Sequence, residues 1–535
     1  MVGPRWAAGI VARVDACVPI TGGNLRLGPL EAIARRGAPV QISEAARARI
    51  VAAAGVIGRA AEQGRPVYGV TTGLGSRVVE SVDGAAAAEF SLRTLRGRAM
   101  AVGEPLAREL VRATMAVRLN GLCAGGAGAG PGVADGLAGL LNAGVHPRVP
   151  RSGSVGAADL CLLAHVGLTL IGEGEAELDG ETVPSAVALA RADLEPVRLG
   201  PKDGLAICSS SAVSVAIAAL ALIDAEACLE AAQASAALTM EGFRANLSPL
   251  DPRVVAARPA PGQAWSASGL RALLAGGQLT EPGAARRLQD PLSLRCTSQI
   301  HGSMRVALDL LAGALEPELN GAADNPLVIA DDEEVVSTGN FHVPALALAL
   351  DATAIAIGQL ATAAAERQAR CTAERLSGLA PNLVLGGPTH SGVAPLSKTA
   401  QALMIEIRQR ASPFALLSTV GADGVEDDST AAAQAALRLR DQLERLRLLI
   451  AVELVVAAQA VELAAPERLG AGTAAIQRCV RGLVEPLLDD RALGPEVERL
   501  AAGAVASGQL QADVRRALQA AEGSGRPETD RAASP

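Results

Sequence analysis

The sequence predicts an all-α protein with a long central helical bundle and a smaller, mixed N-terminal region. The chain of 535 residues is 50% hydrophobic but only 1% aromatic, so its core must consist of Ala, Leu and Val. Alanine and leucine are strong helix formers, whereas sheets favour β-branched and aromatic residues. From about residue 205 the chain consists of long Ala/Leu-rich segments with charges on one face, a pattern typical of helices that pack against other helices.

Three regions are expected along the chain. Residues 1–204 alternate short helical patterns with glycine-rich breaks, residues 205–520 carry the long helices, and the polar tail at 521–535 is expected to be disordered. The long helices are predicted at 211–243, 303–317, 343–378, 395–411 and 430–463. In the last of these segments, four apolar side chains recur at helical spacings of four, three and four residues: Leu439, Leu443, Leu446 and Ile450.

Charge and cysteine usage exclude several classes of protein. The 48 Lys and Arg against 56 Asp and Glu give a net charge of −8, which excludes a basic nucleic-acid-binding surface as the organising feature of the protein. Eight scattered cysteines without a Cys-x-x-Cys pair indicate reduced thiols, and the five histidines show no metal-ligand spacing. The first residues show no signal peptide, and the apolar stretch 204–223 contains serines and many alanines, so we expect a buried helix there. The sequence therefore predicts a cytoplasmic protein without a metal, nucleic-acid or membrane partner.

Four dense segments differ from ordinary bundle sequence. The first, at 67–76, is a glycine-rich loop that holds Tyr68, the only tyrosine of the chain. A phenol placed near a cation is a candidate general base. The second segment, 141–175, contains Gly153-Ser154-Val155-Gly156-Ala157-Ala158-Asp159-Leu160. The third, 289–302, contains Asp290-Pro291-Leu292-Ser293-Leu294-Arg295. The fourth, 318–342, contains Glu318-Leu319-Asn320, Asp324-Asn325-Pro326 and Gly339-Asn340-Phe341-His342.

In this order, the four segments closely resemble the histidine/phenylalanine ammonia-lyase family, the aromatic amino acid lyases, from about residue 20 to about residue 465. The resemblance implies a largely helical homotetramer in which each active site is shared among three subunits. Members of the family eliminate ammonia from an aromatic amino acid or shift its amino group to the β-carbon. Their electrophile is a methylidene-imidazolone, which forms from an internal Ala-Ser-Gly when the glycine nitrogen attacks the alanine carbonyl and water is lost.

The cofactor segment departs from this family pattern. The family reads Gly-Ser-Val-Gly-Ala-Ser-Gly-Asp-Leu, whereas here one residue is missing and Ala157, Ala158 and Asp159 stand where the triplet is expected. Ala158 has no hydroxyl to lose, and the residue that offers the nitrogen, Asp159, carries a bulky side chain. We therefore expect no methylidene-imidazolone and no other cofactor. Literal Ala-Ser-Gly triplets at 267–269 and 506–508 lie outside the required context and are interpreted as chance matches.

Further differences lie around the expected electrophile. The family's asparagine beside the cofactor matches Ser209, and its second tyrosine matches Leu292. The Ser-His pair that helps to read the substrate ring in histidine lyases matches Gly97-Arg98, and the glutamine before the late acid matches Val425. The positions that differ from the family thus cluster around the electrophile.

Five family positions keep the residue that the resemblance implies. Tyr68 matches the catalytic base, Arg295 matches the arginine that holds the substrate carboxylate through a bidentate fork, and Glu426 matches the acid near the substrate amine. Asn320 and Phe341 match pocket residues. The expected site therefore has Tyr68 and Glu426 as catalytic residues, and its substrate-binding residues are Arg98, Ser209, Leu292, Arg295, Asn320 and Phe341.

Three interpretations of the function remain open. The first is a lyase- or isomerase-type enzyme that acts on a small amino-acid-like carboxylate without the prosthetic group. A general base alone contributes about 10²–10⁴-fold, so its substrate must supply activation through a better leaving group or a more acidic C–H. The second is a non-catalytic binding or regulatory protein that retains the pocket. The third is an ordinary aromatic amino acid ammonia-lyase whose cofactor forms despite the altered segment.

Arg98 and the apolar helices lead to two further expectations. Arg98 either points outward and pairs with Glu104, or faces the pocket, where two guanidinium groups repel unless an anion lies between them. In the second case the substrate carries a second acidic or strongly hydrogen-bond-accepting group, and dicarboxylates bind better than phenylalanine. The wide apolar faces between 303 and 463 imply burial against other subunits, so a homotetramer with shared sites is expected.

Overall fold

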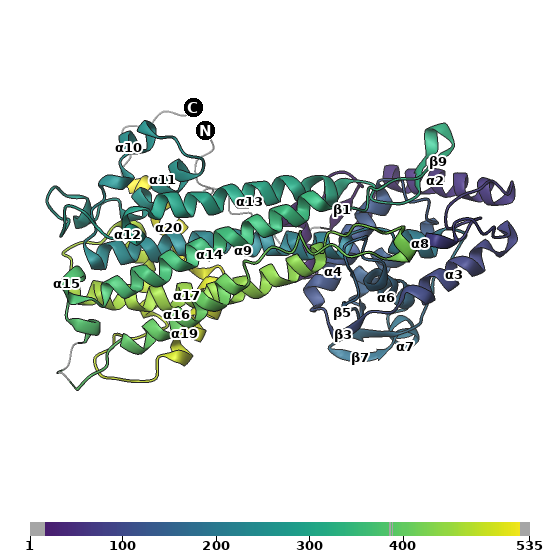
Figure 1. The fold of residues 1–535 in the computed structure, drawn as a ribbon. Helices are drawn as coiled ribbons and strands as arrows, with labels where there is room; N and C mark the ends of the chain where they lie inside the picture. Colours follow the sequence, from purple (N-terminus) through teal and green to yellow (C-terminus); the bar gives the residue numbers. More distant parts are fainter. Residues whose placement is uncertain (1–16, 385–386, 388, 525–535) are drawn as a thin grey trace, which may run out of the picture.

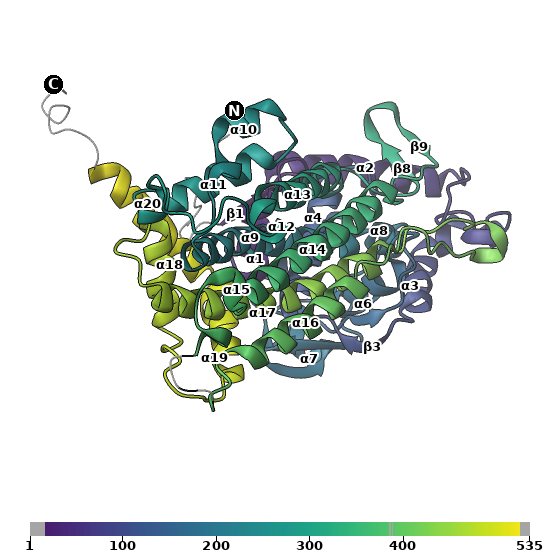
Figure 2. The same ribbon diagram turned by 60° about the vertical axis from the view of Figure 1, so that its left-hand side comes forward.

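The computed structural model describes residues 17–384, 387 and 389–524, which form a mostly helical, elongated molecule (Figure 1). Long helices run side by side through most of its length, and the smaller N-terminal region is gathered at one end (Figures 1 and 2). The predicted all-α fold class is confirmed. The sequence interpretation of the first six residues lies outside the described part of the chain.

The five long helices of the bundle lie close to where the sequence predicts them. They are α9 (Ala212–Phe243), α13 (Thr297–Asn320), α14 (Pro344–Cys371), α16 (Ala394–Gln409) and α17 (Ala432–Ala464). α14 ends at Cys371, seven residues before the predicted end, because residues 374–377 form a separate short helix. α13 continues past Pro317, where the prediction stops. Periodicity thus locates each helix but not its ends.

The central helix of the bundle is α9, which is apolar on all sides and almost entirely buried. A helix with this composition needs neighbours around it, and α4, α13, α14 and α17 all pack against it. By length and composition, the segments Asp203–Phe243 and Pro344–Cys371 would be long enough to cross a membrane, but 94% and 67% of their most apolar windows are buried inside the protein. Such burial is typical of core helices.

Shorter elements complete the fold. The remaining helices are α1 (Leu27–Arg36), α2 (Glu44–Glu62), α3 (Ala87–Arg98), α4 (Arg108–Cys123), α5 (Pro131–Ala143), α6 (Leu160–Leu170), α7 (Ser185–Arg191), α8 (Asp203–Cys208), α10 (Pro252–Ala257), α11 (Gln263–Leu274), α12 (Leu292–Arg295), α15 (Glu374–Ser377), α18 (Ala471–Arg481), α19 (Gly494–Leu500) and α20 (Gln509–Ser524). A π-helical turn, Ala501–Ala506, lies between α19 and α20.

The strands are short and form four small sheets. They are β1 (Val18–Ile20), β2 (Val40–Ile42), β3 (Val102–Pro105), β4 (His146–Pro147), β5 (Pro150–Ser152), β6 (Glu175–Leu178), β7 (Glu181–Pro184), β8 (Leu327–Ile329) and β9 (Glu334–Val336). β1 and β2 pair in parallel with Val18 opposite Val40, whereas β3–β5, β4–β6–β7 and β8–β9 are antiparallel. Seven of these nine strands precede residue 204, as the predicted mixed region requires. The β8–β9 hairpin lies over α2.

Two of the predicted region boundaries do not coincide with breaks in the structure. The boundary between residues 204 and 205 falls inside α8, which packs on α3 and α6 and so belongs with the N-terminal region. The tail expected from residue 521 begins with helix, because α20 continues to Ser524. Its remaining residues lie outside the described part of the chain. Both differences arise because tertiary packing, rather than local composition, sets where these helices end.

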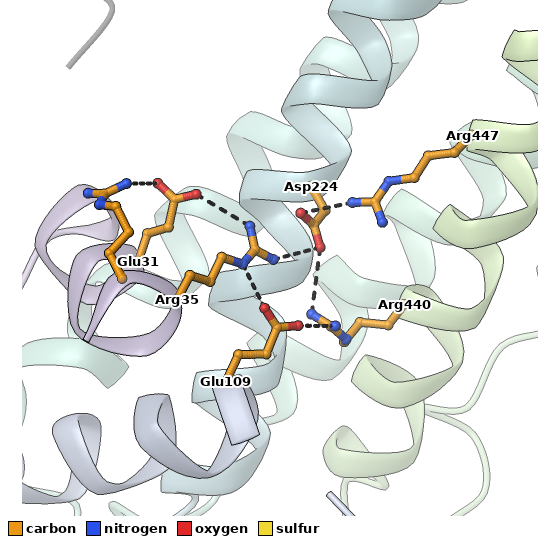
Figure 3. A network of polar contacts seen from close by, with 7 residues as sticks. Glu31, Arg35, Glu109, Asp224, Arg440 and Arg447 are labelled. Atoms are coloured by element: carbon orange, nitrogen blue, oxygen red, sulfur yellow. Dashed lines mark hydrogen bonds and ion pairs between the residues drawn. The ribbon is translucent and has the colours of Figure 1, made fainter. Parts of the chain in front are cut away.

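A network of charged side chains joins the N-terminal region to the bundle (Figure 3). Asp224 of α9 accepts contacts from Arg35 of α1 at 2.9 Å and from Arg447 of α17 at 2.9 Å. Glu109 of α4 pairs with Arg35 at 2.7 Å and also with Arg440 of α17. The two neighbouring arginines hold the pKa of Glu109 below its usual value although burial opposes this. Four helices that are distant in sequence are thus held together at one point.

A buried ion pair fixes the interior of the N-terminal region. Arg118 of α4 binds Asp324 at 2.6 Å, and both side chains are almost completely excluded from solvent. The same guanidinium donates a hydrogen bond to the carbonyl of Ala206 in α8. Arg118 therefore connects three segments, α4, α8 and the stretch around residue 324, that are far apart in the sequence.

We expect Asp324→Asn to destabilise the protein by about 3–5 kcal/mol, because it leaves the charge of Arg118 buried without its partner. The matched control is Asp135→Asn, which removes the same charge from the pair between Asp135 and Arg47, where each side chain is 47% exposed. That change should cost no more than about 1 kcal/mol. Urea unfolding followed by circular dichroism measures both, and equal losses in the two variants would contradict the role of Arg118.

Candidate active site

A cavity of about 290 Å³ lies at the end of the molecule that carries the N-terminal region. Segments from six parts of the chain line it, and they include most of the residues that the sequence assigns to the site. The lining residues are Tyr68, Leu74, Gly75, Ser76, Arg77, Arg98, Ala157, Ala158, Leu160, Leu205, Ser209, Asn325, Phe341, Ala422 and Glu426. Tyr68, Arg98, Ser209, Phe341 and Glu426 are thus brought together with the altered cofactor segment.

The glycine-rich loop holds Tyr68 at the cavity wall. Gly69 adopts φ +69°, and a β-carbon at this position would lie 2.5 Å from Leu205 of α8, so only glycine lets the loop approach this helix so closely. The phenol oxygen of Tyr68 accepts a hydrogen bond from the backbone N–H of Gly75 at 2.9 Å. This contact orients the side chain and leaves the oxygen free to donate or accept a further proton.

The altered cofactor segment forms the opposite wall as a tight turn. Ala158 adopts the left-handed conformation with φ +60°, which is uncommon for a residue with a β-carbon. The carbonyl of Gly156 accepts a hydrogen bond from Thr430 at 2.9 Å, and the N–H of Ala431 donates to Val155, so the turn is tied to the start of α17. Ala157 and Ala158 therefore present only methyl groups and backbone to the cavity.

Asp159 anchors this turn from within the protein. Its carboxylate is completely buried and accepts hydrogen bonds from the Ser154 hydroxyl at 2.7 Å and from the backbone N–H of Ser214 at 2.8 Å. Burial raises the pKa of Asp159, and these hydrogen bonds oppose the shift. Its own backbone N–H donates to the carbonyl of Ser210 at 2.8 Å. The nitrogen that a ring closure would use is therefore already engaged in a hydrogen bond to Ser210.

The residues present do not fit the chemistry that forms a methylidene-imidazolone. The residue between Ala157 and Asp159 is an alanine without a hydroxyl, and the following nitrogen belongs to aspartate rather than glycine. The triplet at 267–269 lies within helix α11, and the triplet at 506–508 follows the π-helical turn. Neither triplet lines the cavity.

Arg98 is the last residue of α3, and its half-buried side chain lines the cavity. Its Nη1 donates a 3.3 Å hydrogen bond to the carbonyl of Thr94. Burial raises the pKa of the Cys161 thiol and raises that of Cys208 to about 12, and the positive charge of Arg98 opposes both shifts. In the described part of the chain no carboxylate forms an ion pair with Arg98, and this includes Glu104. Of the two orientations considered for Arg98, the structure has the inward one.

Glu426 lies on a turn that closes the cavity from the side of α17. The N–H of Gly421 donates a hydrogen bond to the carbonyl of Glu426 at 2.7 Å, which folds the turn back on itself. Two residues later, Asp428 contacts His342 at 3.2 Å and accepts a hydrogen bond from Ser418 at 2.7 Å. Because His342 follows Phe341, this pair positions two walls of the cavity relative to one another.

Asn325 lines the cavity, whereas Asn320 does not. The amide of Asn320 bonds the backbone of Leu25, accepting from its N–H at 2.7 Å and donating to its carbonyl at 3.1 Å, which fixes the chain before α1. Asn325 lies beside Ser209 and is held by the N–H of Thr338 at 3.0 Å. Both asparagines lie in the segment that the sequence singles out, and only the three-dimensional structure shows that Asn320 fixes the chain before α1 while Asn325 lines the cavity.

Leu292 and Arg295 lie on α12, at the opposite end of the molecule from α2 and α3, the two helices between which Tyr68 lies in the sequence (Figure 1). The side chain of Leu292 is 62% exposed, and the Nε of Arg295 is buried without a hydrogen-bond partner in the described residues. One copy of the chain therefore does not bring these two residues to the cavity. No group of three or more His, Cys, Asp or Glu that could hold a metal is found among the described residues.

Comparison with known proteins identifies the family. The sequence model for aromatic amino acid lyases matches residues 25–482, which is most of the chain. The protein is an aromatic amino acid lyase family member. A histidine ammonia-lyase of Symbiobacterium thermophilum is 40% identical over 496 residues, which cover 92% of this chain and 97% of that protein. The match extends over both the N-terminal region and the bundle.

Two solved structures show how widely this family's chemistry varies on the same fold. Tyrosine aminomutase from Streptomyces globisporus superposes with a TM-score of 0.89 at 32% identity, covering 94% of this chain and 99% of that one. Ergothionase from Treponema denticola, an ergothioneine-degrading enzyme, also superposes with a TM-score of 0.89, at 29% identity over 92% of this chain and 99% of that chain. Family membership therefore establishes the fold but leaves the reaction open among several.

Proposed function

We propose that this lyase-family protein catalyses an elimination, or the related addition or isomerisation, on a small amino-acid-like carboxylate without a methylidene-imidazolone. The observation that carries the proposal is the cavity that combines Tyr68, Arg98 and Glu426 with a wall of Ala157 and Ala158. General-base, charged and hydrogen-bonding groups are present there, and the triplet that supplies the family's electrophile is absent.

The missing electrophile constrains the substrate. A positioned general base contributes about 10²–10⁴-fold, which is too little to remove a proton from an unactivated β-carbon. The substrate must therefore carry a better leaving group or a more acidic C–H. The Treponema relative degrades ergothioneine, so this fold also accommodates a substrate other than histidine, phenylalanine or tyrosine. A betaine is a suitable substrate class for this site, because its quaternary nitrogen keeps its positive charge at any pH and departs as a neutral amine.

Tyr68, Arg295 and Glu426 have distinct roles in this elimination. Tyr68 takes the proton from the β-carbon, the electrons of that C–H bond form the new double bond, and the amine leaves with the electrons of the C–N bond. Arg295 holds the α-carboxylate through two parallel hydrogen bonds, and Glu426 lies near the amine. Ser209 and Asn325 line the cavity between them, and Phe341 provides an apolar surface.

We also propose that the working protein is a cytoplasmic homotetramer with shared sites. Arg295 lies on α12, at the opposite end of the molecule from α2 and α3, and it does not line the cavity that holds Tyr68 (Figure 1). A site that uses both residues therefore needs at least two chains. Apolar side chains are exposed along the outer faces of three bundle helices, as expected for surfaces that pack on other copies: Val306 and Leu310 of α13, Leu348 and Ile355 of α14, and Ile405 of α16.

Tyr68→Phe should lower kcat for a betaine or amino-acid substrate by about 10²–10⁴-fold while binding changes little, because it removes only the phenol oxygen. Turnover is measured by mass spectrometry of the products and affinity by calorimetry. The thermal unfolding midpoint of the variant serves as the control for loss of the Gly75 contact. A variant that turns over substrate as fast as the wild type would exclude Tyr68 as the base, and a wild type that binds but converts nothing would favour a binding protein.

The intact mass of the purified protein tests the cofactor directly. A mature methylidene-imidazolone would leave the chain lighter by two water molecules, whereas we expect the unmodified mass because Ala158 has no hydroxyl to lose. Peptide mapping across residues 150–165 gives the same information at the segment itself. A loss of two waters there would show an ordinary ammonia-lyase of this family.

Mixing two inactive variants tests the shared site. Tyr68→Phe and Arg295→Leu should each be inactive as pure proteins, but co-expression should restore activity because some sites receive both intact residues from different chains. In randomly mixed tetramers about a quarter of the sites combine the two. Light scattering of each pure variant confirms that assembly is intact. If both variants assemble normally and the mixture stays inactive, the shared-site arrangement is wrong.

A further inference from the structure

The cavity contains a cation that the proposed reaction does not use. Two arginines line it, and one of them, Arg77, lies on the exposed rim and pairs with Glu80 at 3.2 Å. The half-buried side chain of Arg98 also lines the cavity, and its charge acts on the thiols of Cys161 and Cys208. Among the described residues, its side chain makes one hydrogen bond, to Thr94 at 3.3 Å, so most of its five N–H donors are left without a protein acceptor.

The neighbouring acid does not neutralise this cation. Glu426 is the only carboxylate among the cavity-lining residues, and no ion pair joins it to Arg98 in the described part of the chain. The proposed function places Glu426 near the amine of the substrate. The cavity thus offers a ligand one acidic group, Glu426, and a cation at Arg98 that is not paired with it.

A guanidinium is never deprotonated in a protein, so Arg98 keeps its charge whichever ligand is bound. A neutral aromatic or apolar side chain placed against it would exclude water from the cation without replacing the lost hydrogen bonds. A carboxylate or a similar planar anion instead matches the guanidinium in charge and in geometry. The cavity therefore favours a ligand that is anionic at this position and disfavours one that ends in an apolar ring.

We propose that the substrate carries a second anionic group on its side chain, and that Arg98 binds this group. The proposal rests on the proposed function in one respect, since it assigns the α-carboxylate to Arg295. The substrate is then a dianionic compound with one acidic group at each end and the reacting carbons between them. Arg98 is the specificity-determining residue that separates this substrate from histidine and phenylalanine.

Calorimetry on the intact, assembled protein tests the proposal with pairs of probes of equal length. Succinate, glutarate and adipate are compared with the monoacids butyrate, valerate and hexanoate and with L-phenylalanine. The wild type should bind at least one diacid about 30-fold or more tightly than its monoacid partner, as expected for a desolvated charge pair. Arg98→Leu should abolish this difference and leave the affinity for the monoacids unchanged.

Arg93→Leu is the matched control, because Arg93 lies on the same helix, pairs with Glu89 and points into solvent. It should retain the preference for the diacid, which separates a direct contact from the loss of one positive charge nearby. A wild type without preference for any of the three diacids would overturn the proposal, as would an Arg98→Leu variant with unchanged diacid affinity. An Arg93→Leu variant that loses the diacid preference as fully as Arg98→Leu would also overturn the proposal.

The outcome is independent of turnover. Tyr68→Phe should retain the diacid preference, because binding does not need the base. A protein that shows the preference but converts no substrate would contradict the proposed elimination and leave the role of Arg98 intact. A protein that converts substrate but does not prefer diacids would contradict the role of Arg98 alone.

Discussion

The buried pair between Arg118 and Asp324 is the constraint on which the cavity depends. Asp324 immediately precedes Asn325, and the carbonyl that Arg118 also binds belongs to Ala206, between Leu205 and Ser209. Lys202, equally buried, donates to the carbonyls of Ala127 and Pro326 and so fixes the same two segments from the other side. Burial lowers the pKa of Lys202 to about 8. Charged groups this far from water need every partner in place, which makes the arrangement of the cavity wall rigid.

The charged network in Figure 3 extends this constraint to the whole molecule. Asp224 and Glu109 hold α1 and α4 of the N-terminal region against α9 and α17 of the bundle. Tyr68 and Arg98 belong to the N-terminal region, whereas the turn that carries Glu426 leads into α17 of the bundle. The relative position of base and acid therefore depends on contacts at the junction that lie outside the cavity. In a site built from such distant segments, single cavity-lining residues can differ, and the chemistry with them, while the fold that positions them stays the same.

The sequence predicts the long helices and most of the residues that line the cavity, and the reasons can be identified. Ala/Leu-rich stretches with helical spacing locate the five long helices, and the order of family motifs brings Tyr68, Ser209, Phe341 and Glu426 to one place. The resemblance assigns Asn320 to the pocket, whereas Asn325, in the neighbouring motif, lines the cavity of one chain, and only the fold shows this difference. Arg118 gives no signal at all, since a single arginine in an apolar helix has the same pattern whether it is exposed or buried. The inward orientation of Arg98 likewise depends on where α3 ends.

The altered turn and the inward arginine have a common chemical consequence. Gly156 still adopts φ +86°, and a β-carbon there would lie 2.3 Å from Thr430, so the turn keeps the close packing on α17 even though the residues after it differ from the family. Asp159 remains fully hydrogen-bonded beneath it. The turn at the cavity wall is thus closely packed and presents no hydroxyl at Ala158. On the proposed function, selectivity comes from the cation at Arg98, and reactivity comes from a leaving group of the substrate that departs without an external electrophile.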